Sequence, residues 1–421
     1  MTAFEPAPAA APTESDAAPV PDTAGQRVLI VMPTWFGDCL MATPALRALR
    51  AAFPGAHVEA MIREPLAPLL EGLPFLDGVV THGGGVKRSG KGRSSGGGRG
   101  SSPFGMAKRL SRMKFDVAVL LPNSFRSAAL VTMAGIKRRI GYDRDGRGML
   151  LTDRLVPRHD GKDYVPVPAL EYYLSIAAYL GAPAVNGTDA ETANGTADGN
   201  AQRRRVPAAA DHRMEVATRA EDDVRAASML EPAKGRPVVL LNPGAAKVEK
   251  RWPPQSFAQL AGRLHDELGL AVAVTGAPDE REVVARVAGA APCRVIDLLK
   301  AGATLGQLKS VVKLSRVVVT NDTGPRHLSA ALGTPVVTLF GPTLPAWTEI
   351  GFAHERKVTA AEPAAVDAMR QITVSRVFDA TAGLMAETEP RDPEPDPPSA
   401  RASGRSPAKR GRSAGKSAGR A

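Results

Sequence analysis

Cysteine is scarce in this sequence, and long apolar runs are absent. The 421 residues include two cysteines, Cys39 and Cys293, which excludes a disulfide framework and a metal site made of thiolates. No apolar run approaches the ~18 residues that a membrane-spanning helix needs. Residues 1–25 contain acids and prolines where a secretory signal requires a basic start and an apolar core. We therefore expect a cytoplasmic protein that begins with a disordered leader, 1–25.

Acidic side chains are missing from the two segments that carry most of the positive charge. Residues 83–102 have five Lys or Arg, residues 401–421 have seven, and the formal net charge of the whole chain is +11. Both segments are rich in Gly and Ser and bury too little apolar surface to fold. We expect a disordered insertion, 83–102, a low-complexity insertion, 184–207, and a disordered basic tail, 388–421. The tail is a candidate for binding anionic lipid or nucleic acid, and a solvated extension without a specific ligand is the alternative.

The rest of the first half alternates short apolar runs with segments of helical periodicity. Apolar runs predict strands at 27–32, 57–61 and 115–121. Leu and Ala at helical spacing predict a helix over 39–53, and a loop followed by a helix over 122–136. Strands that alternate with helices indicate a parallel sheet covered on both faces.

The same pattern restarts at residue 236. Strands are predicted at 237–241, 270–275, 316–320 and 335–340, with helices at 257–269 and 304–315 between them. The sequence therefore predicts an α/β protein of two doubly wound, Rossmann-like domains, 26–183 and 208–365, which face a central cleft where ligands bind. A final helix over 366–387 is expected to pack back on the first domain.

The stretch NDTGPRH leaves a predicted strand and opens a predicted helix. Pro325 suits the first helical position, and Thr323 or Gly324 precedes it as the cap. The free amide donors at such a helix start form a site for phosphate. Asp322 is then placed to hold sugar hydroxyls, and His327 to donate to phosphate or ribose. The alternative is that Asp322 caps the helix and His327 only packs.

Two further loops follow neighbouring predicted strands of the second half. In NPGAAKVEKRWPP, Gly244 lets a ligand approach the backbone, and Lys247, Lys250 and Arg251 supply cations that would clamp a diphosphate. In TGAPDERE, Glu280 stands near a helix start, where an acid binds ribose hydroxyls in nucleotide-binding folds. Loop lysines are usually solvated, and an acid at a helix start also stabilises the dipole without a ligand. Together the three loops predict a donor site.

Asp38, in the stretch WFGDCLMATP, lies at the start of a predicted helix of the first half, where the dipole favours its ionised form. Facing a sugar diphosphate across the cleft, this carboxylate is a candidate general base for a hydroxyl nucleophile. The alternative is a helix cap. The seven histidines show no metal-ligand spacing, so we predict no metal site and no cofactor.

Five stretches occur in an order and spacing that resemble the ADP-heptose:lipopolysaccharide heptosyltransferases, glycosyltransferase family 9, and most closely its heptosyltransferase II members. They are WFGDCLMATPALRALR, LLPNSFRSAALVTMAGIKRRIGY, NPGAAKVEKRWPP, TGAPDERE and NDTGPRHLSAALGTPVVTLFGPT. The resemblance runs from about residue 27 to 345. It implies a GT-B fold and an inverting, metal-independent transfer of a heptose from ADP-heptose to the inner core of lipopolysaccharide, at the inner face of the cytoplasmic membrane.

The resemblance also implies roles for single residues. Asp38 would match the family's catalytic base, and Lys250 the lysine that neutralises the departing diphosphate. Glu280 would match the acid that binds the adenosine ribose, and Asp322 the aspartate that holds the heptose. Thr323, Gly324 and His327 would match the phosphate-binding turn. The acceptor-side candidates would be Asn123, Ser124 and Arg126.

The sequence departs from the family's pattern at the cleft. Arg326 stands where heptosyltransferase II relatives usually have methionine, Lys247 replaces an aromatic or small residue, and a cysteine-bearing stretch before the last helix is missing. These departures leave alternatives: a family 9-like glycosyltransferase with another nucleotide sugar or acceptor, or a non-catalytic nucleotide-sugar-binding scaffold with a basic tail. The pair Asp143 and Asp145 resembles a metal-binding pair of another glycosyltransferase class, but it lies in a polar turn of the half without the phosphate loops.

Overall fold

The computed structural model describes residues 23–83, 102–157, 159–160, 163–164, 167–181, 190–192, 204–206, 212–343 and 345–389. These residues belong to a unit that ends at Glu389. The expected leader, the two insertions and the basic tail lie wholly or largely outside the described residues, so the domain boundaries that they delimit stay a prediction.

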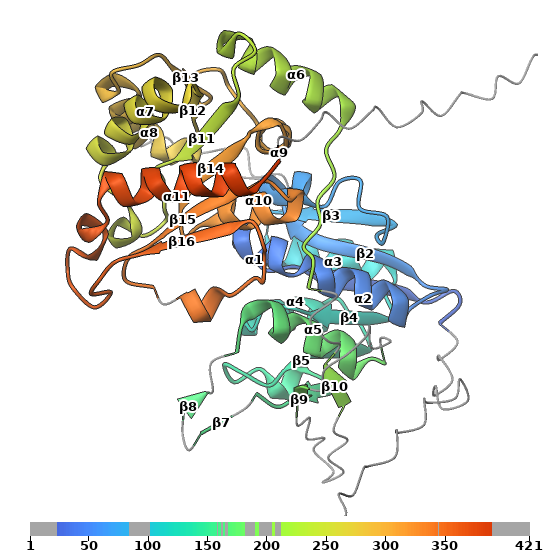
Figure 1. Ribbon diagram of the computed structural model, residues 1–421. Coiled ribbons are helices and arrows are strands. Elements are labelled where there is room, and N and C mark those ends of the chain that lie inside the picture. The colour runs from blue at the N-terminus through green and yellow to red at the C-terminus, as the bar shows by residue number, and fades with distance from the viewer. Residues whose placement is uncertain are drawn as a thin grey trace, which may run out of the picture. The chain divides into compact units, whose positions relative to one another are not determined.

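The first half contains a parallel sheet of six strands in the order β3-β2-β1-β4-β5-β6 (Figure 1). Apolar runs at the sheet's centre form its buried middle strands, as the sequence predicts. Two edge strands, β3 and β6, come from shorter or more polar stretches. The strands are β1 (Arg27–Val31), β2 (His57–Arg63), β3 (Gly78–His82), β4 (Val117–Leu120), β5 (Arg138–Tyr142) and β6 (Asp153–Leu155).

Helices cover both faces of this sheet. One face packs against α3 (Pro103–Met113) and α4 (Phe125–Met133), and the other against α1 (Phe36–Met41), α2 (Thr43–Ala52) and α5 (Ala169–Tyr179). The single helix predicted over 39–53 is interrupted at Ala42. Pro44 explains the break, because proline has no amide hydrogen to continue the helix from α1 and instead suits the first turn of α2.

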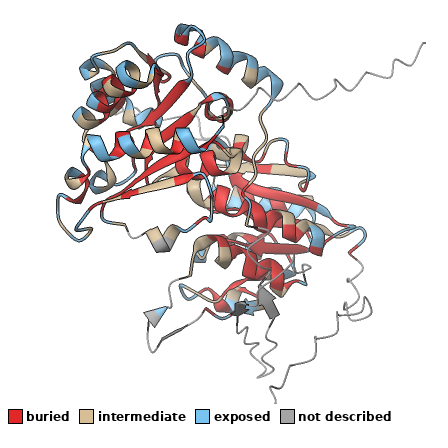
Figure 2. Cartoon of the chain, in the orientation of Figure 1, coloured by how far each residue is buried: buried red, intermediate tan, exposed pale blue. Residues whose placement is uncertain are grey.

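The second half repeats the arrangement, with the strand order β13-β12-β11-β14-β15-β16 and every neighbouring pair parallel. Figure 2 shows the strands of both sheets mostly buried. The twofold repeat confirms the predicted α/β fold. The strands are β11 (Val238–Asn242), β12 (Ala271–Val274), β13 (Val295–Asp297), β14 (Val317–Asn321), β15 (Val336–Phe340) and β16 (Glu355–Thr359).

The helices of the second half begin at the carboxyl ends of its strands. They are α6 (Ala220–Leu230), α7 (Pro254–Leu268), α8 (Arg281–Ala290), α9 (Leu305–Leu314), α10 (Gly324–Leu332) and α11 (Val374–Glu387). We expected the last helix to pack on the first half. Instead α11 packs on α7 and β16, because its apolar face, with Val377 and Leu384, completes the second core. The indole nitrogen of Trp252 also donates to Ile372 O, just before this helix (2.9 Å).

Contacts between the halves include a buried lysine and a pair of helices. The fully buried Lys309 of α9 donates from Nζ to the carbonyl oxygens of Pro68, in the first half, and Ala217 (2.6 Å for the latter). Helix α1 packs against α10. The second contact brings together two helix starts that the sequence analysis assigned to opposite sides of the cleft.

Candidate functional site

Two buried asparagines fix the loops at the carboxyl edge of the second sheet. Asn321, the last residue of β14, donates from Nδ2 to Pro243 O and Gly244 O (3.0 and 3.1 Å), and its Oδ1 accepts from Trp252 N (3.1 Å). Asn242, at the end of β11, donates to the Oγ1 atoms of Thr320 and Thr323 (3.1 and 3.3 Å). The loops after β11 and β14 are therefore held to each other by side chains. Sequence reasoning missed both asparagines, although Asn321 lies in the motif.

Lys250 and Asp322 form an ion pair between these two loops. Lys250 Nζ lies 2.9 Å from Asp322 Oδ2, and the lysine side chain is 25% exposed while the aspartate is 5% exposed. The two residues predicted to serve the diphosphate and the sugar are thus in direct contact. A dianionic diphosphate placed here would compete with Asp322 for the ammonium group.

Arg326 holds the other oxygen of Asp322. Its Nη1 lies 3.3 Å from Asp322 Oδ1, and it donates at 2.8 Å to both the carbonyl oxygen and the hydroxyl of Thr348. Its Nε and Nη2 donate to the two carboxylate oxygens of Glu355 (2.6 and 3.1 Å), and Thr338 Oγ1 donates to Oε1 of the same carboxylate (2.6 Å). The guanidinium is fully buried. Arg326, which departs from the family's sequence pattern, is therefore paired with a buried carboxylate on β16.

Glu280 lies against Gly244, as the donor-site prediction requires. A Cβ added at Gly244 would lie 1.9 Å from Glu280 Oε2, so only glycine fits beneath this carboxylate. The same Oε2 accepts from Ala277 N (2.7 Å) and so caps its own turn, Pro278–Glu280. Glu280 thus has a structural role at its own turn, and this role leaves its Oε1 without a hydrogen bond among the described residues.

The start of α10 lies directly against the start of α1. Thr323 is the N-cap and Gly324 the first helical residue, so Pro325 takes the second position and not the first. A Cβ added at Gly324 would lie 1.8 Å from Phe36 Cδ1. A Cβ added at Gly37 would lie 2.7 Å from the Cδ2 atom of His327. Two glycines, one on each helix, therefore allow the helices to approach this closely.

His327 is buried at this contact, and only 4% of its surface is exposed. Burial and, to a smaller extent, the neighbouring Arg326 lower the pKa of His327 to about 3, although Asp322 opposes the change. The ring is therefore neutral at physiological pH, and it carries one N–H donor. Its buried Nδ1 has no hydrogen-bond partner among the described residues.

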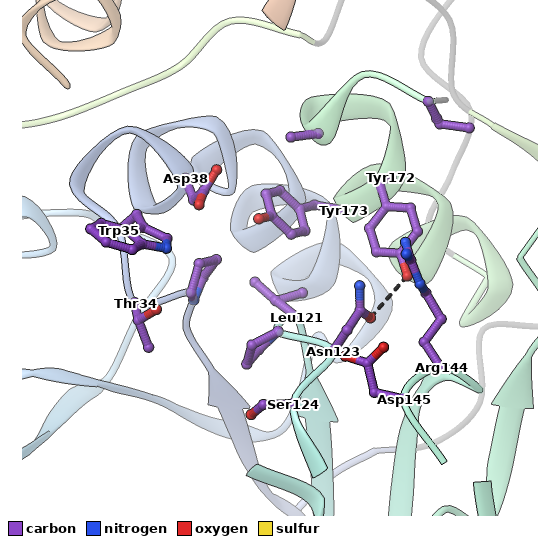
Figure 3. Close-up of a pocket in the computed structure, with 14 residues that line it drawn as sticks. Thr34, Trp35, Asp38, Leu121, Asn123, Ser124, Arg144, Asp145, Tyr172 and Tyr173 are labelled. Carbon is purple, nitrogen blue, oxygen red and sulfur yellow. Dashed lines mark hydrogen bonds between the residues drawn. The ribbon is translucent and has the colours of Figure 1, made fainter. Parts of the chain in front are cut away.

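A cavity of about 450 Å³ opens at the carboxyl edge of the first sheet (Figure 3). Asp38, from α1, lines it opposite side chains of the β4–α4 loop, the turn after β5, and α5. Figure 3 shows Asp38 between Trp35 and Tyr173, with Asn123 and Arg144 farther from Trp35 than Asp38 is. The lining residues are Pro33, Thr34, Trp35, Asp38, Leu121, Pro122, Asn123, Ser124, Arg144, Asp145, Val167, Ala169, Tyr172 and Tyr173.

Asp38 is not the cap of α1. Trp35 occupies the N-cap position, and Asp38 is the third residue of the helix. Desolvation by burial raises the pKa of Asp38, which is opposite to the effect that we expected from the helix dipole. The reason is that α1 has six residues, so its dipole is small while the carboxylate is half-buried.

The acceptor-side candidates divide between the cavity and the surface. Asn123 and Ser124 line the cavity, and Asn123 Oδ1 accepts from Tyr172 Oη and from Arg147 Nη2 (2.9 and 3.2 Å). Ser124 caps α4 by accepting from Ser127 N. Arg126, two residues after Ser124, is exposed and is not among the residues that line the cavity.

Several cavity residues were not identified from the sequence. Tyr172 and Tyr173 come from α5, about fifty residues after Asn123, and Tyr172 stacks on Tyr142 (centroids 3.9 Å apart). Arg144 and Asp145 come from the turn that we set aside as a polar connection. In the part of the chain that the structure describes, no three His, Cys, Asp or Glu side chains gather as a metal site, and no helix is long and apolar enough to cross a membrane.

The family model "Glycosyltransferase family 9 (heptosyltransferase)" matches residues 104–373, more than half of the chain. The chain belongs to glycosyltransferase family 9. It is therefore a glycosyltransferase, and the resemblance read from the sequence is confirmed.

Curated relatives of this family 9 chain carry heptosyltransferase names. The chain is 28% identical over 387 residues to lipopolysaccharide heptosyltransferase 2 of Escherichia coli K12, covering 86% of this chain and 99% of that one. It is 28% identical over 345 residues to lipooligosaccharide heptosyltransferase 2 of Haemophilus influenzae, covering 76% and 85%.

Solved structures agree with the fold of this family 9 chain. ADP-heptose LPS heptosyltransferase II of E. coli matches with a TM-score of 0.66 at 25% identity, covering 86% of this chain and 99% of that one. A family 9 glycosyltransferase from Veillonella parvula matches with a TM-score of 0.68 at 20% identity, covering 87% and 99%. The two six-stranded halves are therefore those of a GT-B glycosyltransferase.

Proposed function

We propose that this family 9 glycosyltransferase transfers a heptose from ADP-heptose to the inner core of lipopolysaccharide, with inversion at the anomeric carbon and without a metal ion. The names of its full-length relatives support the sugar and the acceptor. One observation in the structure supports the site: the Lys250–Asp322 pair lies beside the start of α10, which packs on the start of α1, where Asp38 lines a cavity.

The donor occupies the loops of the second half in this proposal. Glu280 binds the ribose hydroxyls next to Gly244, where the absent side chain leaves room for the Glu280 carboxylate. The diphosphate lies between Lys250 and the amides of Thr323 and Gly324 at the N-terminus of α10. Asp322 binds the hydroxyls of the sugar, and His327, as a neutral ring, donates its single N–H on the same side.

The acceptor occupies the cavity of the first half, where Asn123 and Ser124 offer hydrogen bonds to its hydroxyl groups. The Asp38 carboxylate takes the proton from the attacking acceptor hydroxyl while that oxygen bonds to the anomeric carbon. The bond from that carbon to the diphosphate oxygen breaks on the opposite face, and its electron pair stays on the diphosphate. Attack opposite the leaving group inverts the configuration.

Two charge effects favour the transition state over the bound substrates. Negative charge grows on the departing diphosphate, so the fixed ammonium of Lys250 and the amide dipoles stabilise it more as the bond breaks. The raised pKa of Asp38 makes its carboxylate a stronger base than a solvated aspartate. The transfer rate is therefore expected to rise with pH as Asp38 loses its proton.

The Lys250–Asp322 pair also supports a change of partner for the lysine when the donor binds. Without a donor, Lys250 neutralises Asp322. When the diphosphate binds, the ammonium turns toward it, and Arg326 remains as the cation beside Asp322. Because the inner core is attached to lipid, the enzyme acts at the inner face of the cytoplasmic membrane in this proposal.

Calorimetry with ADP, UDP and GDP tests the donor class. ADP is expected to bind at least about tenfold more tightly than the other two, because the pocket beside Gly244 and Glu280 is assigned to adenosine. Incubation with ADP-heptose and a heptose-free inner-core acceptor, in the presence of EDTA, should then release ADP and give a product of inverted anomeric configuration. Equal affinity for the three nucleotides, or no product in EDTA, would count against the proposal.

A further inference from the structure

Three aromatic side chains are exposed at the carboxyl edge of the first sheet. Trp35, Phe104 and Phe125 are 65%, 78% and 50% exposed. Each stands at the start of a helix: Trp35 is the N-cap of α1, Phe104 is the second residue of α3, and Phe125 is the first residue of α4. Helices that follow parallel strands begin at the carboxyl edge of the sheet, so the three rings share that edge. We call them the aromatic rim.

The aromatic rim adjoins the cavity that holds Asp38. Trp35 lines the cavity itself, and so does Ser124, which immediately precedes Phe125. Helices α3 and α4 pack against each other on one face of the sheet, which places Phe104 on the helix next to Phe125. A molecule that covers the rim therefore also covers one side of the cavity mouth.

Cations accompany the rim. Arg63, Arg109 and Arg126 are exposed. The side chain of Arg63 reaches Thr34 O (3.5 Å), beside Trp35, and that of Arg109 reaches Thr81 O (3.0 Å), at the end of β3. We call these three arginines the rim arginines.

Cations predominate on the α3–α4 side of this edge, whereas Asp38 and Asp145 line the cavity beside it. Burial lowers the pKa of His82, the last residue of β3, and the neighbouring Arg63 and Arg126 lower it further, so their positive fields overlap there. Residues 103–142 contain eight Lys or Arg and one acid, Asp116, and of these cations Lys114, Lys137 and Arg138 lie at the amino ends of β4 and β5. Asp116 binds Arg27 N at the opposite, amino edge of the sheet. The α3–α4 side of the carboxyl edge is thus basic as well as aromatic.

We propose that the aromatic rim and the rim arginines dock this enzyme on the surface of an anionic lipid bilayer, with the acceptor cavity opening toward the lipid. Aromatic side chains favour the interfacial layer of a bilayer, where an apolar ring meets polar headgroups. Each arginine near an anionic surface strengthens attachment about fivefold, which is about 1 kcal/mol. The proposal rests on the proposed function in one respect: a lipid-attached acceptor gives the docking its purpose.

The charge pattern favours a bilayer over a protein partner. A flat anionic surface satisfies three arginines from different elements at once, whereas a protein would need carboxylates matched to each. Three rings spread over three helix starts are likewise suited to shallow insertion and do not form one pocket. The sequence 103–142 has no acid at this edge that would repel anionic headgroups.

Vesicle flotation with the full-length chain tests the proposal without donor or acceptor. The protein is mixed with vesicles of phosphatidylglycerol and phosphatidylcholine in equal parts, or of phosphatidylcholine alone. Wild type should float with the anionic vesicles and much less with the neutral ones. Phe104→Ser with Phe125→Ser should lower the partition coefficient at least about tenfold, and Arg109→Gln with Arg126→Gln about 25-fold at low salt.

Two matched controls remove the same kinds of side chain elsewhere. Val224→Ser with Val366→Ser deletes two highly exposed apolar groups, 70% and 98% exposed, and Arg225→Gln with Lys234→Gln deletes two exposed cations of the second half. Both should float like wild type. Thermal melting should leave all four variants within a few degrees of wild type, because every substituted side chain is exposed.

Three results would overturn the docking proposal: rim variants that float like wild type, controls that fall as far as the rim variants, or equal binding to neutral vesicles. Binding of the rim arginines to RNA in place of vesicles would also overturn it. The proposed function is tested separately with a lipid-free acceptor fragment. Transfer to that fragment by the Phe104→Ser, Phe125→Ser variant, when that variant no longer floats, would support both proposals. Absence of transfer by wild type would contradict the proposed function alone.

Discussion

Replacing Arg326 by methionine, the residue usual in heptosyltransferase II relatives, should destabilise this protein strongly. The guanidinium is fully buried, and it binds both oxygens of Glu355, whose side chain is 1% exposed. In Arg326→Met, the carboxylate of Glu355 keeps the Thr338 hydroxyl (2.6 Å) and a distant Lys357 ammonium (3.9 Å). Breaking a buried ion pair from one side costs about 3–5 kcal/mol. That is a large part of the ~5–15 kcal/mol by which a typical domain is stable.

The double variant Arg326→Met, Glu355→Leu separates the pair from its environment. Replacing a whole buried pair by apolar side chains is often neutral or stabilising by about 1–4 kcal/mol. The double variant should therefore recover most of the loss, although Asp322 then has Lys250 as its remaining cation.

Urea unfolding of the full-length chain, followed by fluorescence, gives the three free energies of unfolding. We expect the free energy of unfolding of the single variant to lie far below that of wild type, and that of the double variant to lie close to it. An Arg326→Met variant within about 0.5 kcal/mol of wild type would refute this reasoning, and so would a double variant no more stable than the single one.

Three further predictions concern contacts between elements. Because the pKa of His327 is about 3 in the folded protein and near 6.5 in the unfolded chain, the unfolded state binds the extra proton below pH 6.5. Stability should thus fall by about 2 kcal/mol from pH 7 to pH 5 through this residue, and by less in His327→Gln, as urea midpoints would show. Gly324→Ala should push Phe36 away and weaken ADP binding in calorimetry, whereas Gly289→Ala, which meets open space on α8, should not. Lys309→Met leaves the half-buried carbonyl oxygens of Pro68 and Ala217 without this donor and should lower the unfolding free energy by about 1–3 kcal/mol, and an unchanged urea midpoint would contradict this.

Periodicity predicts the fold well where strands are aliphatic and buried on both faces. The central strands β1, β4, β11 and β14 consist mostly of Val, Leu and Ile, and the shortness and β-branched content of these runs favour strands over helices. The edge strand β6 is Asp-Arg-Leu, a stretch with no strand pattern of its own. It forms because its backbone pairs with β5, which is information that lies outside the stretch.

The donor motifs predict neighbours in the loops but not the partners that those loops acquire from other elements. Lys250, Glu280 and Asp322 follow adjacent strands, so their proximity follows from the order of a parallel sheet. Glu355 lies 29 residues after Arg326, on an edge strand, and no local pattern links the two. The sequence shows that Arg326 departs from the family's pattern, but it does not show that Glu355 balances the charge of Arg326.

The acceptor side was harder to predict for a similar reason. Tyr172 reaches Asn123 across the sheet from α5, and α5 reads from the sequence only as an apolar helix. For Asp38, the sequence indicates a helix start but neither the six-residue length of α1 nor the burial of the carboxylate, and those two facts set the direction of its pKa.

Asp38→Asn tests the central claim most directly. The amide keeps the shape of the side chain but cannot accept the proton of the acceptor hydroxyl. Transfer of heptose from ADP-heptose to a heptose-free inner-core acceptor should fall by at least about a thousandfold, while calorimetry shows ADP binding within about twofold of wild type, because Asp38 belongs to the other half. An Asp38→Asn enzyme that retains a wild-type transfer rate would contradict the assignment of Asp38 as the base.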